Sequence, residues 1–310
     1  MLPNSESARP PGHLTEIDTA KFFEPLPESE LAGWEGRPLS ILRPHNIQTA
    51  ALEALSARDP TEKVRLSSRH AKNILAGAYA YTHPDLPLPM DIPGRPDRPQ
   101  LVEPKFLEQR KLGNAEGRAV LLHAVAHIEF NAINLAWDAA YRFPNMPEAF
   151  YTDWASVAAD EARHFTLLND RLLELGYQYG DFPAHNGLWE MARKTRSDLL
   201  TRMALVPRLL EARGLDVTPG IIYKLKHVGD TRAVEILQLI LSEEIGHVEI
   251  GSRWFAYACA QAGKPVAETF LALLRSHASG MVRGPFNRPA RLASGFSAEE
   301  VDALEQFHAA

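Results

Sequence analysis

The chain has 310 residues, of which 45% are hydrophobic and 23% charged, and its formal net charge is −6. This balance excludes wholesale disorder, and the length is ample to bury a core. The acidic surplus argues against nucleic acid as a partner. The single cysteine, Cys259, excludes an intrachain disulfide and cysteine-rich metal sites, and it fits a reducing cytoplasm. We expect neither a signal peptide nor a stretch long enough to cross a membrane.

The N-terminal third of the chain predicts a tail followed by a wrapping region. Residues 1–14 are polar and proline-rich, which predicts a disordered tail. Residues 15–113 form a region that is first helical and then proline-rich. Within it, Asp59 and Pro60 are typical of a helix start, and we expect that helix to run to about Tyr79.

The proline-rich part and the region after it differ sharply in pattern. Seven prolines between Thr82 and Pro104 exclude a helix or a central strand, so we expect an extended segment that wraps the main body. Residues 114–263 show helical periodicity and no useful strand alternation, which predicts an all-α bundle. Its four long helices are expected at 115–142, 147–176, 187–213 and 230–263.

Two shorter regions complete the prediction. A connector that holds Pro219 and Gly220 is expected between the third and fourth long helices, with one short helix in it. Residues 264–310 predict a C-terminal extension that packs on the bundle. It contains a helix to about His277, an irregular stretch over 280–295, and a last helix that the capping box Ser297-x-x-Glu300 opens.

Glu-x-x-His pairs are the first sign of chemistry in the bundle. Residues three apart lie on one face of a helix, so each pair can hold one metal ion. The 25 glutamates and 12 histidines among 310 residues predict about one such pair by chance (25 × 12 / 310). The chain has three: Glu161/His164 and Glu244/His247 in the bundle, and Glu305/His308 in the last helix, which we take as the chance example.

The two bundle pairs differ from the third in their surroundings. Glu161/His164 and Glu244/His247 are the only polar residues in otherwise apolar helical stripes. Glu129 in the first helix and Glu211 in the third interrupt apolar stripes in the same way. A charge in a core-facing stripe is costly unless it is paired or bound to metal. The alternative is a set of coincidental buried polar pairs.

The levels of these residues along the helices support one shared centre. Glu129 and Glu161 are each 16 residues from a turn at Asn145, so they lie at the same height in a helical hairpin. Glu211 reaches the level of Glu244 only if the helical direction continues through 219–228.

The composition of the predicted centre indicates its metal. Four carboxylates and two imidazoles suit two divalent ions in a bundle core, and they favour iron, with manganese as the alternative, over copper. Two bridging carboxylates would hold the ions close enough to act together on dioxygen.

The motifs that carry these residues resemble those of a known superfamily. The segment Asp160-Glu161-Ala162-Arg163-His164 is similar to the acidic-Glu-x-Arg-His motif of di-iron carboxylate enzymes, and Glu243-Glu244-Ile245-Gly246-His247 matches it except that Gly246 replaces the arginine. The chain thus resembles the ferritin-like superfamily over about 115–262. With HAVAHIEFNAI and GPFNRPARLASGF, it resembles a family of uncharacterised bacterial ferritin-like proteins through most of its length.

The resemblance implies a ferritin-like four-helix bundle with two metal ions, and it implies no substrate. It also implies that the acid before each motif glutamate orients the histidine of the other pair. Asp160 would then orient His247, and Glu243 would orient His164. The alternative for both acids is a solvated helix flank.

Three other features of the sequence are candidate sites. His123 and His127 lie one turn apart, but His127 is about 160° round the helix from Glu129, so we expect this face to be packed against the N-terminal region or wet. Basic residues of the third helix predict either a solvated face or a strip that attracts phosphate; they are Arg193, Lys194, Arg196, Arg202 and Arg208. The stretch 280–295 is either a substrate gate or a structural wrap.

Three functions remain open. The first is an oxygen-dependent di-iron oxidoreductase, a hydroxylase or oxidase of a small-molecule substrate, which needs an external electron donor because no Rossmann or flavin motif is visible. The second is a ferritin-like metal store or ferroxidase, against which the long terminal extensions argue. The third is a tRNA-modifying hydroxylase, since a known tRNA hydroxylase shares the bundle, although the acidic balance argues against it. A homodimer is compatible with each.

Overall fold

The computed structural model describes residues 46–81, 90–107 and 111–309. Over these residues the chain is all-α, as expected: its helices are joined by turns, and β structure is limited to two isolated bridges. The expected tail (1–14) and the stretch that follows it (15–45) lie outside the described residues.

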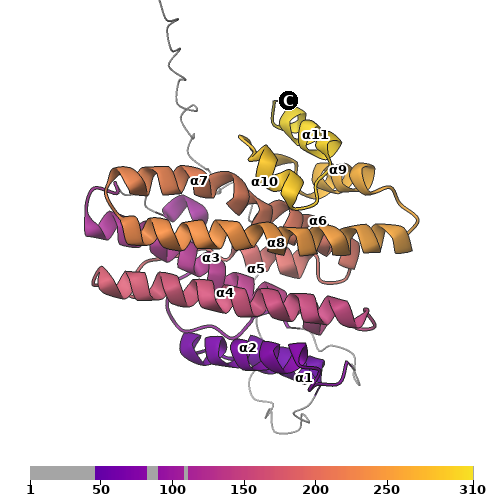
Figure 1. The fold of residues 1–310 in the computed structure, drawn as a ribbon, viewed down its shortest axis with the longest axis horizontal. Coiled ribbons are helices and arrows are strands. Elements are labelled where there is room, and N and C mark those ends of the chain that lie inside the picture. Colours follow the sequence, from indigo (N-terminus) through magenta and orange to yellow (C-terminus); the bar gives the residue numbers. More distant parts are fainter. Residues whose placement is uncertain (1–45, 82–89, 108–110, 310) are drawn as a thin grey trace, which may run out of the picture.

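Two short helices pack beneath the main body (Figure 1). They are α1 (Ile47–Ser56) and α2 (Pro60–Leu75), and α2 contacts α4 while α1 contacts α3. Asp59 caps α2 as predicted, because its carboxylate accepts a hydrogen bond from the Glu62 N–H at 2.8 Å. The helix ends at Leu75 rather than near Tyr79, because the chain turns through Gly77 at φ 68°.

The described part of the proline-rich segment wraps the body as predicted. Residues 90–103 contain no helix, and only a 3-10 turn, η4 (Pro104–Phe106), follows them. The Gly94 N–H donates to the Leu55 carbonyl at 2.7 Å, and Leu101 forms a bridge with Ala184. The segment therefore connects α1 with the loop before α5. The expected extended residues 82–89 lie outside the described part of the chain.

Three of the four long helices occur within two residues of their predicted bounds. They are α3 (Ala115–Arg142), α4 (Glu148–Glu174) and α8 (Thr231–Gln261), and they run side by side in Figure 1. The Asn114 side chain caps α3 by accepting a hydrogen bond from the Gly117 N–H at 2.8 Å. Asn145 turns the chain between α3 and α4 with a φ of 63°.

The prediction of a single third helix over 187–213 is wrong. The chain forms α5 (Gly187–Lys194), α6 (Leu199–Leu205), a π-helix η5 (Val206–Glu211) and α7 (Ala212–His227). Asp198 starts α6 because its carboxylate accepts from the Leu200 and Thr201 N–H groups. No connector surrounds Pro219, which lies inside α7, and the packing of α7 on α8 compensates for the one hydrogen bond that proline removes.

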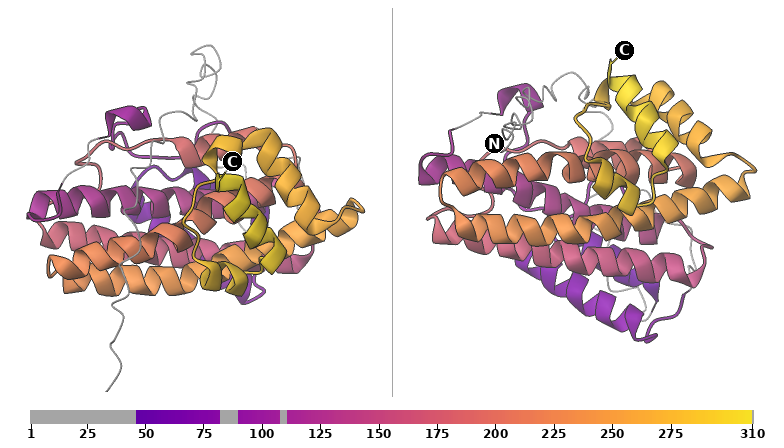
Figure 2. Two further views of the ribbon diagram at one scale, coloured as in Figure 1. Left: turned by 90° about the horizontal axis from the view of Figure 1, so that it is seen from above. Right: turned by 45° about the horizontal axis from the view of Figure 1, so that its top comes forward.

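The C-terminal extension covers one end of the body, over α6, α7 and α8 (Figure 2). Its helices are α9 (Val266–His277), the 3-10 turn η6 (Ser279–Met281), α10 (Arg288–Ala293) and α11 (Ala298–Ala309). The predicted capping box is present: Ser297 N–H donates to Glu300 Oε2 at 2.8 Å, and Glu300 N–H donates to Ser297 Oγ at 3.1 Å. The stretch expected to be irregular, 280–295, contains α10.

Helix α3 departs from the expectation that no segment is long and apolar enough to cross a membrane. By length and composition α3 passes that test, yet 67% of its apolar window is buried inside the molecule. It contacts α1, α4 and α5. Its apolar character is therefore that of a core helix, which faces neighbours on more than one side.

Candidate metal centre

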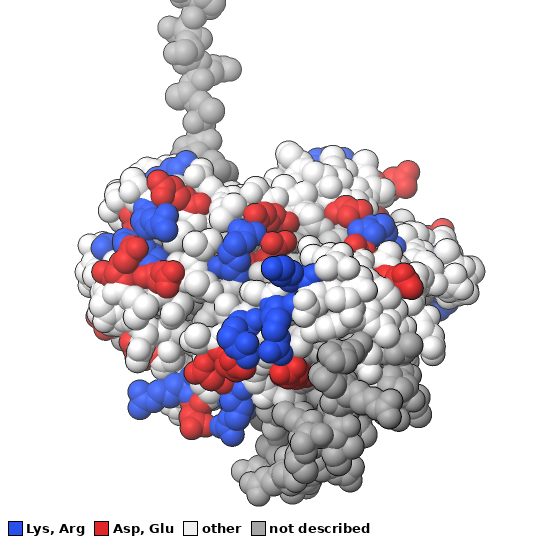
Figure 3. All heavy atoms as spheres, turned by 60° about the horizontal axis from the view of Figure 1, so that its bottom comes forward, with Lys and Arg blue, Asp and Glu red and all other residues white. Residues whose placement is uncertain are grey.

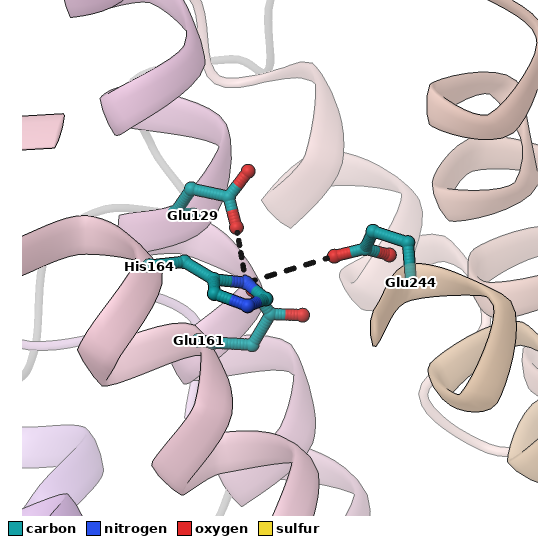
Figure 4. A group of neighbouring side chains, drawn as sticks. All are labelled: Glu129, Glu161, His164 and Glu244. Carbon is teal, nitrogen blue, oxygen red and sulfur yellow. Dashed lines mark hydrogen bonds and ion pairs between the residues drawn. The ribbon is translucent and has the colours of Figure 1, made fainter. Parts of the chain in front are cut away.

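The candidate ligands come from four helical segments that surround one point of the core. Glu129 projects from α3, Glu161 and His164 from α4, and Glu244 from α8, and their side chains converge in Figure 4. His247 follows one turn after Glu244. Glu211, the last residue of η5, lies close enough to Glu244, Glu161 and His247 to interact with their charges. The structure thus brings the six predicted ligands into one region.

Four of these residues form a compact group. One ligand atom from each of Glu129, Glu161, His164 and Glu244 lies within 4.8 Å of all the others, and no member is more than 9% exposed. His164 Nδ1 is 3.3 Å from Glu129 Oε2 and 3.3 Å from Glu161 Oε2, and it is 4.0 Å from Glu244 Oε1. Two donors at about 2.1 Å from one ion and at right angles to each other lie about 3.0 Å apart. The spacing of the group therefore fits a single metal ion after small side-chain shifts.

A second half of the centre lies around His247. Its Nδ1 is 3.0 Å from Glu161 Oε1 and 3.4 Å from Glu244 Oε1. Glu161 directs Oε2 to His164 and Oε1 to His247, so its carboxylate lies between the two halves as a bridging ligand would. Glu244 Oε1 likewise faces both imidazoles.

Two polar atoms of this second half lack a hydrogen bond. His247 Nδ1 is close to Glu161 but not aligned with it, and Glu211 Oε2 is buried with no partner. Glu211 lies outside the compact group of four. Buried polar atoms normally have a hydrogen-bond partner, so these two unpaired atoms need an explanation. A second metal ion bound by His247, Glu211 and the bridging glutamates would satisfy both.

The outer nitrogen of each imidazole meets the acid that the sequence indicated. His164 Nε2 is 2.6 Å from Glu243 Oε2, and His247 Nε2 is 3.4 Å from Asp160 Oδ2. Each ring is thereby oriented with Nδ1 toward the carboxylates of the centre. Such partners fix the tautomer and the direction of a ligand histidine.

Arg163 joins the two outer acids, a role that sequence reasoning missed. Its guanidinium donates to Asp160 Oδ1 and to Glu243 Oε2, both at 2.8 Å. One arginine therefore serves both halves, which accounts for Gly246 at the position where the second motif lacks its arginine. The signal was the arginine of the first motif, but only the contact between α4 and α8 shows that it reaches both acids.

The charges of the centre shift the pKa values of its imidazoles. Burial alone would lower the pKa of His164, but hydrogen bonds to Glu129 and Glu161 outweigh burial and raise it to about 11. Burial likewise opposes the charge on His247, yet Glu244 and Glu161 raise its pKa well above the ordinary value. Without metal, both rings therefore hold protons that partly neutralise the glutamates.

The carboxylates shift in different directions. Burial raises the pKa of Glu129 well above the ordinary value, and burial also raises that of Glu244. Burial and the charges of Glu244 and Glu161 raise the pKa of Glu211 to about 8. Burial also opposes ionisation of Glu161, but the charge of His247 and the hydrogen bond of His164 lower its pKa far below the ordinary value. Glu161 is thus the anionic middle of the cluster.

His123 and His127 are both buried, and the loop between α4 and α5 packs on them. His127 also lies beside Pro93 and Arg95 of the proline-rich segment, so the expected packing against the N-terminal region is confirmed for His127. The Gly180 N–H donates to His123 Nε2, and His127 contacts the Tyr179 hydroxyl and the His185 carbonyl at 2.9 and 3.0 Å. Burial lowers their pKa values to about 4 and about 3. Beside His127 lies a cavity of about 460 Å³, lined mainly by apolar side chains.

The basic residues of the expected third helix do not form one solvated face. Arg202 is 1% exposed and pairs with Asp138, and Arg208 is 1% exposed and pairs with Glu300. On the face shown in Figure 3, basic and acidic groups lie next to one another. In the stretch 280–295, Arg291 is buried against Asp216, which is the contact of a structural wrap.

Comparison with known proteins gives a family. A family described as "Protein of unknown function (DUF455)" matches residues 56–302. The chain belongs to this family. A protein of Haemophilus influenzae, described as "Uncharacterized protein", is 45% identical to the chain over 259 residues, which cover 80% of this chain and 90% of that protein. No solved structure matches the chain significantly.

Proposed function

We propose that this DUF455 protein is an oxidoreductase with a ferritin-like four-helix bundle that binds two metal ions, iron or else manganese, and uses dioxygen on a small-molecule substrate. One observation carries the proposal. Glu161 lies between two imidazoles, each of which faces the carboxylates with Nδ1 and an outer acid with Nε2. Buried polar groups of this number and arrangement are costly without a cation to neutralise them.

The distances group Glu129 with His164 and place Glu161 and Glu244 between the two imidazoles, so Glu129 and His164 would hold one ion and Glu161 and Glu244 would be shared. Glu211 would join His247 at the other ion, because its buried Oε2 has no partner and its charge interacts with that of His247. Bound ions of this type supply redox chemistry with dioxygen, and carboxylates with imidazoles are ligands that suit iron and manganese.

The chain's own residues prepare the centre for these ions. The core excludes water from Glu161 and His164, which are at most 1% exposed. Asp160 and Glu243 hold the rings in place, and Arg163 fixes the two acids relative to each other. The protons that the imidazoles carry without metal must leave when ions bind, so loading releases protons. We propose the cytoplasm as the location, since the single buried Cys259 needs no oxidising compartment.

The test is iron loading of the metal-free protein. Two ferrous ions per chain should bind without oxygen, and air should then produce the near-ultraviolet absorption of a coupled ferric pair. Binding of one ion per chain, or of two with no such absorption, would refute the proposal. The tRNA-modifying alternative gains no observation, because Arg202 and Arg208 of the expected basic strip are engaged in buried ion pairs.

A further inference from the structure

The C-terminal extension reaches the π-helix that carries Glu211. Arg208, three residues before Glu211 in η5, donates to both carboxylate oxygens of Glu300 at 2.9 and 3.0 Å. Glu300 belongs to α11, 92 residues further along the chain. Both side chains are at most 2% exposed, so the pair is screened from water. The position of η5 is thus tied to the last helix.

The residues around Arg208 hold its guanidinium in place. Three aromatic rings enclose it at 4.3 to 4.9 Å, from Phe255, Phe270 and Phe296. Its Nε donates to Ser252 Oγ of α8 at 3.2 Å. Stacking on aromatic faces suits the planar guanidinium of arginine, whose Nη2 here contacts both oxygens of the Glu300 carboxylate. Without Glu300 the positive charge of Arg208 would be buried and unpaired. We would then expect the Arg208 side chain to move out from between the three aromatic rings.

A second contact holds η5 from the side of α8. Pro207 packs against Gly251 so closely that a Cβ on residue 251 would lie 2.3 Å from the Pro207 Cβ. Pro207 also lacks the amide hydrogen of an α-helical turn. Contacts to α8 and to α11 therefore act on adjacent residues of η5.

The π-helix matters because it sets the direction of Glu211. A π-turn contains one residue more than an α-turn, and it is rare because its geometry needs support. Relaxation of η5 to an α-helix would remove the extra residue of the turn and rotate Glu211 relative to α6 by about one residue, about 100°. Such a rotation would move the Glu211 carboxylate away from His247 and Glu244, whose charges it now faces.

We propose that Glu300, acting through Arg208, is a positioning residue for Glu211, and so for the second of the two metal ions. This inference rests on the proposed two-metal centre. The first ion would be held by Glu129 of α3 and His164 of α4, and neither residue belongs to η5. The C-terminal extension therefore controls one half of the centre and not the other.

The experiment is an anaerobic titration of the full-length, metal-free protein with Co²⁺, whose visible absorption reports its ligands. The wild type should bind two equivalents. Glu300→Gln should bind the first equivalent as the wild type does and the second about 10–100-fold more weakly, the usual scale for losing an outer partner. Glu300→Asp, which keeps the charge, should recover part of the loss. Asp302→Asn is the matched control, because Asp302 is in the same helix and forms an exposed pair with Arg288.

Gly251→Ala should perturb η5 without removing either partner of the Arg208–Glu300 ion pair, and we expect it to weaken binding of the second Co²⁺ ion selectively in the same way. If Glu300→Gln does not fold, this variant still tests whether η5 positions the second ion. A wild type that binds fewer than two Co²⁺ ions would refute the two-metal centre itself. A wild type with two ions, together with variants that bind both ions with wild-type affinity and spectra, would reduce the Arg208–Glu300 pair to a structural contact even if their melting temperatures fall.

Discussion

Glu211 makes the stability of the metal-free protein depend on pH in a way that one substitution tests. Its pKa is raised to about 8 by burial and by the neighbouring carboxylates. The folded chain therefore keeps a proton that the unfolded chain releases above its ordinary pKa of about 4.3. The stabilisation is complete below the unfolded pKa and is lost as the pH rises through the folded pKa. Glu211→Gln removes this loss, because the amide does not ionise.

The size of the effect follows from the same pKa. One proton changes the free energy of unfolding by at most about 1.4 kcal/mol per pH unit. Between the unfolded and folded pKa values this sums to about 5 kcal/mol as an upper bound. Glu244 interacts with Glu211 and also has a raised pKa, so these two carboxyl groups share the proton uptake. We therefore expect the variant to gain a few kcal/mol over the wild type at pH 8 and little at pH 4.5.

The assay is urea unfolding of metal-free protein, with a chelator present, at several pH values between 4.5 and 8.5. The wild type should lose stability toward pH 8 more steeply than Glu211→Gln. Glu305→Gln is the control, because Glu305 is exposed on α11. Parallel curves for wild type and Glu211→Gln would show that Glu211 does not hold a buried proton, and would remove it from the interior of the centre.

Further predictions concern the metal itself. Glu161→Ala and Glu244→Ala should each reduce the amount of bound metal and the rise in melting temperature that metal causes, whereas Glu305→Ala should keep the wild-type metal content. Equal losses in all three variants would mean that the position of a Glu-x-x-His pair inside the bundle does not decide whether it binds metal. Asp160→Asn should fold but bind metal about 10–100-fold more weakly, and an unchanged titration would return Asp160 to the role of a solvated flank. Metal affinity should rise with pH, because His164, whose pKa is about 11, must lose a proton before it can bind metal. Calorimetry in buffers of different ionisation enthalpy counts the protons released on metal binding. A count of zero would contradict a protonated His164 ring.

The sequence predicted those helices whose ends depend on local signals. Asn114 before α3 and Asp59 before α2 cap the helices by hydrogen bonds within three residues, so their effect is visible in the sequence. The prediction of one long third helix failed partly because the local cap at Asp198 was not recognised, and partly because the π-turn depends on a distant contact. Pro219 suggested a connector, yet the packing of α7 on α8 keeps the helix continuous. Pro207 gave no sign of a π-turn, since what holds it is Gly251 on another helix.

The candidate site was predictable where helical periodicity decides the facing. Glu129, Glu161 and His164 interrupt apolar stripes, and all three are buried together in the structure. The buried ion pairs were not predictable in the same way. Arg202 and Arg208 resembled a solvated strip, because nothing local indicates that Asp138 and Glu300 lie opposite them. Pairing between residues 64 and 92 positions apart is a property of the fold.

The two halves of the centre are alike in sequence but not in construction. The spacing from Glu129 to Glu161 is 32 residues and that from Glu211 to Glu244 is 33, as in two related hairpins. Yet Glu129 lies within a regular helix, whereas Glu211 ends a π-turn that α8 and α11 hold from outside. The first half is therefore fixed by regular helices, α3 and α4 together with Glu243 and Glu244 of α8, while the second also depends on the C-terminal extension. Because tertiary contacts rather than local helix geometry set the second half, its ion should be the one that substitutions outside the bundle release first.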